Sequence, residues 1–360
     1  MGGRMMDALK ELRKIAEKIY DDLANARVPA IQLPSRTKSN IKFDDRYRVW
    51  KYGSQKITRA ANTLAGAYML LRTVYTLDFI RQMIEQRKTS TLRELYYISE
   101  GWGDAKFHSQ DESDKLAEDL EILTNRLRED LKLRPEEDGA RVIGDIVIEE
   151  VTRKGEKRRI HCQDDVGDSG YSIPYNVEKE KIKFIKTNAD KVIAIEKGGL
   201  FTRFIEERVH KRFNAILIHT AGQAPRATRR FIRRLNEELG LPVYILTDGD
   251  PWGMHIAMVI ISGSAEAAHI RGLTTPDAKW IGVWATDIVD YKLPSDPLTE
   301  IDIKRLHELE RDPRYKDVLW QREIKTFLKI KKKSELEAFS RYGLTYIVDE
   351  YLPTKLKEVD

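Results

Sequence analysis

Three acidic residues follow two apolar runs of this 360-residue sequence. Glu196 comes directly after "KVIAI", and Asp248 and Asp250 come after "VYILT". The carboxyl ends of neighbouring parallel strands meet at one edge of a sheet, so the three side chains are expected to face the same crevice. Carboxylates without His or Cys partners suit a hard cation such as Mg²⁺, which would neutralise phosphate oxygens there. The alternative is a structural ion pair with a lysine or arginine.

Two adjacent tyrosines form the second group of residues with chemical potential. In "TLRELYY" the pattern "TLRE" fits the S/T-x-x-E capping box and predicts a helix over residues 92–99. Arg93 lies four residues before Tyr97 and three before Tyr96, so its guanidinium can hold a phosphate beside either phenol. Spacing does not separate the two tyrosines, and packing of both in a core is the alternative.

A run of arginines in "RATRRFIRR" is the third feature. Its members are Arg226, Arg229, Arg230, Arg233 and Arg234. Several of them share a face of the helix predicted over residues 225–240, which favours a surface that follows DNA phosphates. A solvated helix face is the alternative.

Helices followed by strands are expected in the first part of the chain. An amphipathic N-terminal helix and a proline-punctuated extended arm (25–55) precede apolar spacings that predict helices over 57–88, 92–99 and 111–133. Two strand-like runs, 140–152 and 157–164, follow around a short basic turn. This order is typical of a winged-helix domain.

Strands and helices alternate from residue 190 onward. Apolar runs at 190–196, 214–219, 241–250 and 280–285 predict buried strands, with helical patterns between them. Such alternation is typical of a parallel sheet that is covered on both faces. The remainder of the chain is expected to be mainly helical.

Composition limits the class of protein. Charged residues make up 34% and apolar residues 41% of the chain, which suits a soluble globular protein. The longest apolar run, "HIAMVII", is far shorter than the roughly 20 residues of a membrane span, so no membrane contact is expected. The single cysteine, Cys162, cannot form an internal disulfide, and with no signal peptide visible a cytoplasmic location is expected.

Several motifs together resemble a known family. A strand that ends in Glu196, followed by "KGGLFTRF" and later by "DGD", looks like the Toprim domain of topoisomerases and primases. With "PSRTKSNIKFDDR", "RELYY" and "GQAPRATRRF", the chain from about residue 34 to residue 353 is similar to the A subunit of archaeal DNA topoisomerase VI, a type IIB enzyme. The same family includes the transesterase that makes meiotic double-strand breaks.

The resemblance implies an α/β multi-domain protein. Its expected parts are an N-terminal helix and arm (1–56), a winged-helix, CAP-like domain with the catalytic tyrosine (57–165), and a Toprim parallel α/β domain with a C-terminal helical extension (166–360). Tyr97 falls on the catalytic position of the family's R-[DE]-x-[FY]-Y motif, with Arg93 at its first position.

The resemblance also implies a reaction and an assembly. Tyr97 would displace a 3′ oxygen of double-stranded DNA and become linked to the 5′ phosphate, while Glu196, Asp248 and Asp250 hold Mg²⁺. A homodimer is implied, in which the tyrosine of one protomer works with the metal site of the other. The sequence has no G-x-x-x-x-G-K-[ST] loop, so an ATPase B subunit in an A2B2 heterotetramer would supply the ATP dependence of duplex passage, at the nucleoid.

Other functions stay open at this point. They are a meiotic-type break-forming transesterase, a Toprim primase or nuclease without a covalent step, and a DNA-binding scaffold with a degenerate acidic site. A primase or nuclease would explain the carboxylates but would leave the tyrosine motif unused.

Overall fold

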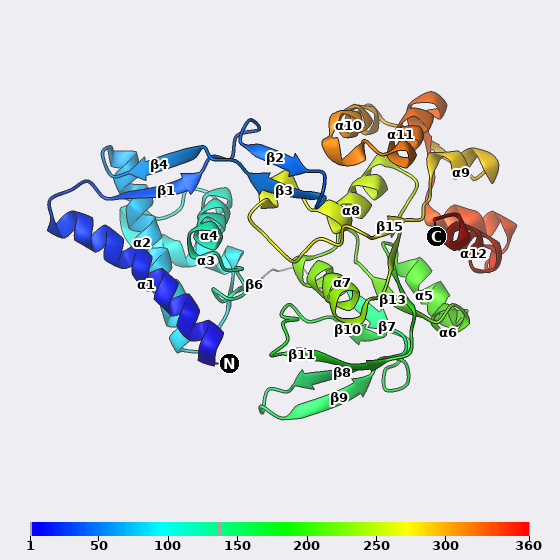
Figure 1. The fold of residues 1–360 in the computed structure, drawn as a ribbon, viewed down its shortest axis with the longest axis horizontal. Coiled ribbons are helices and arrows are strands. Elements are labelled where there is room, and N and C mark those ends of the chain that lie inside the picture. The colour runs from blue at the N-terminus through cyan, green and yellow to red at the C-terminus, as the bar shows by residue number, and fades with distance from the viewer. Residues whose placement is uncertain (1, 135–138, 360) are drawn as a thin grey trace. The chain divides into compact units, whose positions relative to one another are not determined.

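The computed structural model describes residues 2–134 and 139–359, with side chains from residue 7 onward. Two compact units divide the chain. The first contains Met1–Lys42, Trp50–Glu137 and Ala265–Ile270, and the second contains Phe43–Val49, Asp138–Ser264 and Arg271–Asp360. Figure 1 follows the chain from the blue N-terminus to the red C-terminus. No helix in the described part is long and apolar enough to cross a membrane.

The first unit is mainly helical. Its α-helices are α1 (Gly2–Ala24), α2 (Leu64–Glu85), α3 (Leu92–Ser99) and α4 (Gln110–Thr124), and a 3₁₀ helix, η1 (Glu100–Ala105), follows α3. Short strands accompany them: β1 (Ala30–Pro34) pairs antiparallel with β4 (Lys56–Ala60), and β5 (Ser90–Thr91) pairs parallel with β6 (Leu133–Arg134). A two-stranded sheet of β2 (Ile41–Asp44) and β3 (Val49–Tyr52) lies within the predicted arm.

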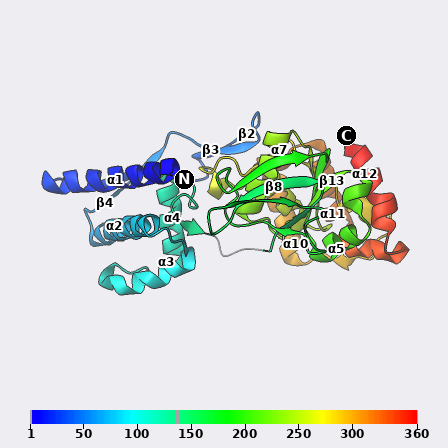
Figure 2. The same ribbon diagram turned by 90° about the horizontal axis from the view of Figure 1, so that it is seen from below.

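The helices of the first unit share one apolar core. Leu12 of α1, Ile80 of α2, Leu95 of α3 and Leu120 of α4 are all at most 4% exposed and belong to the same cluster. In Figure 2, α1 and α2 run side by side. The core therefore fixes α3, which carries the tyrosine pair.

Two helices of this unit are shorter than the sequence pattern predicts. Residues 56–60 form β4, and α2 begins only after Thr63, whose Oγ1 accepts a hydrogen bond from the main chain of Gly66 at 3.1 Å. The helix predicted over 111–133 ends at Thr124, because Asn125 adopts a left-handed conformation with φ 50° that stops it.

A six-stranded sheet in the order β10-β7-β13-β12-β14-β15 organises the second unit. Its strands are β7 (Arg141–Ile143), β10 (Tyr171–Ser172), β12 (Lys191–Ile195), β13 (Ala215–His219), β14 (Val243–Leu246) and β15 (Lys279–Trp280). Strands β13, β12, β14 and β15 are parallel, and β7 and β10 add an antiparallel edge. The connecting helices are α5 (Gly198–Glu206), α6 (Val209–Arg212), α7 (Arg226–Leu239) and α8 (Pro251–Ser262). The predicted alternation of strand and helix is thus confirmed.

The strands that were expected to complete a winged-helix domain fold with the second unit instead. Besides β7, they form β8 (Ile146–Val151) and β9 (Lys157–His161), which join β11 (Ile182–Thr187) in a three-stranded antiparallel sheet. Their partners β13 and β11 come later in the chain, so these pairings draw the strands away from the preceding helices. The compact units therefore meet along the chain near residue 138 and not near residue 165.

The C-terminal part of the second unit is helical, as the sequence predicts. Its elements are α9 (Ala285–Asp290), β16 (Asp296–Pro297), α10 (Glu300–Arg311), α11 (Val318–Ile330), β17 (Lys332–Lys333), a 3₁₀ helix η4 (Leu336–Tyr342), a π-helix η5 (Ile347–Tyr351) and α12 (Leu352–Val359). Two further short 3₁₀ helices occur in the chain, η2 (Ala265–Ala267) and η3 (Pro313–Tyr315).

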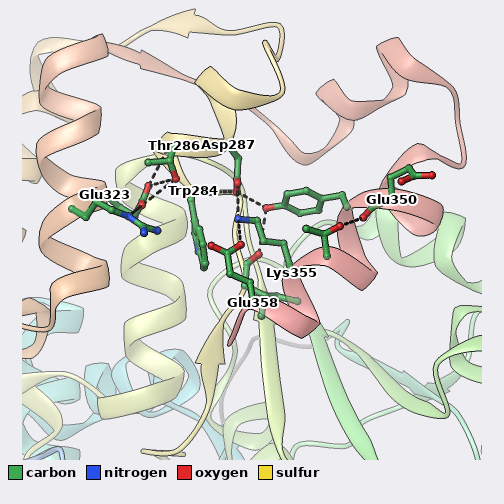
Figure 3. A network of polar contacts seen from close by, with 11 residues as sticks. Trp284, Thr286, Asp287, Glu323, Glu350, Lys355 and Glu358 are labelled. Atoms are coloured by element: carbon green, nitrogen blue, oxygen red, sulfur yellow. Dashed lines mark hydrogen bonds and ion pairs between the residues drawn. The ribbon is translucent and has the colours of Figure 1, made fainter. Parts of the chain in front are cut away.

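A buried ion network fastens α12 to α9 (Figure 3). Lys355 is 3% exposed, and its Nζ lies 2.6 Å from Asp287 Oδ1, 3.0 Å from Glu358 Oε2 and 3.4 Å from the centroid of the Trp284 ring. The hydroxyl of Tyr351 donates to Asp287 Oδ2 at 2.7 Å. Burial raises the pKa of Asp287, and the charge of Lys355 opposes that rise. The lysine and the aspartate therefore depend on each other to remain charged inside the protein.

Candidate active-site residues

The predicted carboxylates lie at one edge of the parallel sheet. Glu196 directly follows β12, and Asp248 lies just beyond the neighbouring strand β14. Glu196 Oε2 accepts a hydrogen bond from the main-chain N–H of Asp248 at 3.0 Å. Asp250 is the N-cap of α8, and its Oδ1 accepts from Gly253 N at 2.6 Å. The structure therefore brings Glu196 and Asp248 together and gives Asp250 a structural task of its own.

Both oxygens of Asp248 have partners within the chain. Its Oδ1 accepts from the main-chain N–H of Leu336 at 2.8 Å, and its Oδ2 accepts from Lys197 Nζ at 2.9 Å. The same ammonium lies 3.5 Å from Glu335 and 3.9 Å from Glu337. Sequence reasoning did not single out Lys197, although its place directly after Glu196 at the end of a strand was a usable signal.

The electrostatics of this edge show an excess of negative charge. Burial is the largest cause that raises the pKa of Glu196 to about 7; the hydrogen bond from Asp248 N opposes the rise, and the charges of Asp248 and Asp250 add to it. Burial also raises the pKa of Asp250. Burial disfavours the charge of Lys197, but the hydrogen bond with Asp248 outweighs it, so the pKa of Lys197 is raised. A positive charge at this edge is therefore favourable, and Lys197 already supplies one.

The donor chemistry of these residues fits a hard divalent cation, because all three supply carboxylate oxygens and repel one another. Within residues 2–134 and 139–359, however, no group of three or more His, Cys, Asp or Glu side chains is arranged to hold a metal ion. Lys197 occupies one side of Asp248, and Gly253 N engages Asp250. Joint metal binding by Glu196, Asp248 and Asp250 therefore requires these side chains to exchange present partners for the ion.

The tyrosine pair lies on α3 in the first unit, and the capping box predicted for this helix is confirmed. Thr91 Oγ1 accepts from Glu94 N at 3.0 Å, and Glu94 Oε2 accepts from Thr91 N at 2.6 Å. The hydrogen bond from the main chain of Thr91 is the main cause that lowers the pKa of Glu94. The first turn of this helix is therefore well anchored, despite its length of 8 residues.

Burial separates the two tyrosines that spacing could not. Tyr96 packs against the core of the first unit, whereas Tyr97 is 59% exposed. Their ring centroids lie 5.4 Å apart. Arg93 is also exposed, one helical turn before Tyr97. Packing is therefore the role of Tyr96, and Tyr97 offers its phenol to solvent.

Ser99 was not considered in the sequence, yet it ties down the end of α3. It is fully buried, its hydroxyl donates to the carbonyl of Tyr96 at 2.6 Å, and its Oγ accepts from Phe107 N at 3.1 Å. A serine in a polar stretch gives no sequence signal for such a role. The contacts hold the helix segment that carries the tyrosines.

The arginine cluster on α7 does not behave as one surface. Arg234 is 1% exposed, donates to the carbonyls of Val177 and Ile182, and pairs with Glu238. Its predicted contact with DNA is therefore wrong, because its guanidinium is consumed inside the protein.

The other arginines of the cluster are partly exposed. Arg230 Nε donates to Glu178 at 2.8 Å, and Arg233 pairs with Glu237 at 2.5 Å. Arg226 and Arg229 lie in the first turn of α7. The cluster thus contributes at least partly to the stability of the second unit.

Family models match three successive parts of the chain. Residues 68–133 match the model of the type IIB DNA topoisomerases. Residues 136–188 match the all-beta domain of the DNA topoisomerase VI alpha chain, and residues 191–356 match the Toprim domain that the topoisomerase 6 A subunit shares with Spo11. The all-beta match covers the strands that fold with the second unit. The Toprim match contains all three predicted carboxylates, and Toprim domains are generally metal-dependent.

Several curated proteins are similar over nearly the whole chain, and all three described here are named as the A subunit of type 2 DNA topoisomerase 6. The relative from Archaeoglobus fulgidus is 49% identical over 352 residues, which cover 98% of this chain and 97% of that protein. The relatives from Methanosarcina mazei (48% identical; 99% of this chain, 97% of the relative) and Halobacterium salinarum (46% identical; 98% and 96%) are also similar. The chain therefore belongs to the A-subunit family of type 2 DNA topoisomerase 6 and is the DNA-cleaving subunit of a type IIB topoisomerase.

Proposed function

We propose that Tyr97 is the nucleophile with which this protein cleaves double-stranded DNA. The observation that carries the proposal is the burial difference within the tyrosine pair: Tyr97 is 59% exposed on a capped helix, while Tyr96 packs in the core. A phenol that serves only packing has no reason to face solvent next to an exposed arginine. The exposed position also leaves room for a DNA strand.

The proposed step is a transesterification. The phenolic oxygen of Tyr97 forms a bond to phosphorus and loses its proton, the bond from phosphorus to the 3′ oxygen breaks, and that oxygen takes up a proton. The product is a 5′-phosphotyrosyl link and a free 3′ hydroxyl. Arg93, one turn away on the same helix, would hold the phosphate with its planar guanidinium and stabilise the charge that develops on it.

Glu196, Asp248 and Asp250 are the proposed Mg²⁺ ligands. When bound, the ion would neutralise phosphate oxygens next to the leaving 3′ oxygen. The mutual repulsion that helps to raise the pKa of Glu196 to about 7 supports this assignment, because a cation relieves it. Lys197 would hold Asp248 in place until the ion arrives.

The proposed assembly follows from the family. A homodimer would cut both strands, each tyrosine working with the carboxylates of the other protomer. The relatives are named as one of two kinds of chain, which supports a B partner with the ATPase activity, in an A2B2 complex. Acting on DNA, the complex would work in the cytoplasm at the nucleoid. We further assign the winged-helix, CAP-like role to α2, α3 and α4 (within 57–165), which follow the N-terminal arm (1–56). Arg226, Arg229, Arg230 and Arg233 remain proposed DNA contacts.

The test is a search for the covalent adduct. The purified protein with a candidate ATPase partner, Mg²⁺, ATP and supercoiled DNA is denatured, and protein bound to 5′ ends is measured, together with relaxation. Tyr97→Phe should give no adduct with duplex binding and thermal unfolding unchanged, whereas Tyr96→Phe should retain it. An adduct formed by Tyr97→Phe but lost in Tyr96→Phe would refute the assignment. Breaks without relaxation would favour the meiotic-type break-forming relative, and cleavage without any adduct would favour a nuclease.

A further inference from the structure

The three-stranded sheet β11-β8-β9 has two different faces. On one face, Ile148 is paired with Ile160 on β9 and with Phe184 on β11, and these side chains are buried or half-buried against the core. On the opposite face, Glu149 stands between Arg159 and Lys183. Alternation along a strand therefore separates an apolar side from a polar side.

The polar side is dominated by cations. The members are Lys157, Arg159, Lys181, Lys183 and Lys186, which we call the basic sheet face. The side chains of Lys157 and Arg159 are 66% and 67% exposed, and Lys183 and Lys186 are exposed as well. Apart from Glu149, the strand positions on this side carry no carboxylate.

A β-bulge puts Lys186 on this face. Phe184 is paired with Ile148 but Lys186 is paired with Val147, so Ile185 is the extra residue. Without the bulge, Ile185 would stand opposite Val147 and Lys186 would point to the apolar side. The irregularity thus brings Lys186 to the same side as Lys183, at the expense of exposing 41% of Ile185.

The acidic groups around this face are already committed. Glu149 lies 3.2 Å from Arg159 and 3.5 Å from Lys157, and the hydrogen bond from Arg159 is the main cause that lowers its pKa. At the far end, Asp145 and Asp164 pair with His161 at 3.0 and 2.7 Å. In the part of the chain that the structure describes, neither Lys183 nor Lys186 makes an ion pair. Positive charge therefore remains unbalanced at the β11 side.

We propose that the basic sheet face binds the phosphate backbone of duplex DNA. The proposal rests on the proposed function and adds a surface to it. Duplex DNA carries about one charge per 1.7 Å of axis, so a sheet about 10 Å wide meets several phosphates. Lysines on a flat, exposed sheet contact phosphates and do not enter a groove, so this surface binds without regard to base sequence.

Charge reversal with a matched control tests the surface. The double variant Lys183→Glu/Lys186→Glu changes the net charge by the same amount as Lys325→Glu/Lys329→Glu, a pair of exposed lysines on α11 that also make no ion pair among the described residues. In Figure 1, α11 and the sheet lie at opposite sides of the second unit. Affinity of each full-length protein for a fluorescent duplex is measured by anisotropy from about 50 to 200 mM salt.

For Lys183→Glu/Lys186→Glu we expect the slope of log K against log salt to fall in magnitude by about 2, and the affinity near 0.1 M salt to drop about tenfold or more. The α11 variant should keep the slope of the wild type. Equal slopes for the two double variants would overturn the surface while leaving the proposed function intact, as would a sheet variant that loses only binding to an acidic protein. A wild-type protein that binds no duplex at all would overturn both.

Discussion

Substitutions of Asp250 separate its structural role from its proposed metal role. Its Oδ1 accepts the hydrogen bond from Gly253 N that caps α8. Asp250→Ala removes this acceptor, and loss of an N-cap costs about 1 kcal/mol. Asp250→Asn keeps an acceptor oxygen and removes the charge. For a unit of this size, 1 kcal/mol corresponds to a Tm shift of about 2–4 °C.

The sign of the charge effect follows from the raised pKa of Asp250, which burial causes. A carboxylate whose pKa is higher in the folded than in the unfolded state binds its proton more tightly when folded, so its ionisation destabilises the protein above that pKa. At neutral pH, Asp250→Asn is therefore expected to be as stable as the wild type or slightly more stable. Asp250→Ala should melt lower than both.

Magnesium adds the second dimension of the assay. A ligand present at 100 times its Kd stabilises the folded state by about 2.7 kcal/mol, which thermal unfolding with and without Mg²⁺ detects. Wild type should show this gain, and both Asp250 variants should lose most of it. If Asp250→Asn kept the full Mg²⁺ response, Asp250 would not be a ligand. If Asp250→Ala melted together with Asp250→Asn, the cap would carry no stability.

Further substitutions test other contacts. Arg93→Ala should slow cleavage about 10²–10³-fold with little change in duplex affinity, and an equal loss of both would contradict a role in charge stabilisation. Because the hydrogen bond with Asp145 raises the pKa of His161, the stability it contributes is present below about pH 6.5 and is lost as pH rises through the raised value; unfolding of His161→Gln against wild type from pH 5 to 9 should show this difference shrinking. Lys355→Met should cost about 3–5 kcal/mol in urea unfolding, since it leaves Asp287 buried and unpaired, and adding Asp287→Asn should recover part of it; a single variant as stable as wild type would contradict the network in Figure 3.

Local signals were sufficient for the elements that carry the site. The capping box places the start of α3 because both of its hydrogen bonds join residues three positions apart. The ends of β12 and β14 follow from continuous apolar runs that only a strand buried on both faces can use. The carboxylates after these strands are consequently brought to one edge without any knowledge of distant contacts.

Long-range partners explain what the sequence could not predict. The runs that form β8 and β9 look like a wing after three helices, but their place is decided by pairing with β11, which no local pattern encodes. Arg234 has the spacing of its surface neighbours, yet two main-chain carbonyls from another segment accept its guanidinium inside the protein. Exposure of Tyr97 and burial of Tyr96 likewise depend on the core beneath α3, and their sequence positions are nearly equivalent.

The acidic edge holds together because each carboxylate has a partner inside the chain. Glu196 accepts from Asp248 N, Asp250 caps α8, and Asp248 is held by Leu336 N and by the ammonium of Lys197. The structural ion pair and the metal site were alternatives in the sequence, but these contacts make them successive states of the same residues. A divalent ion that binds here competes with Lys197 for Asp248 Oδ2, so its affinity is lower than that of carboxylates with no internal cation. In return, the edge keeps its geometry when no ion is bound, and little of the binding energy is spent on assembling it.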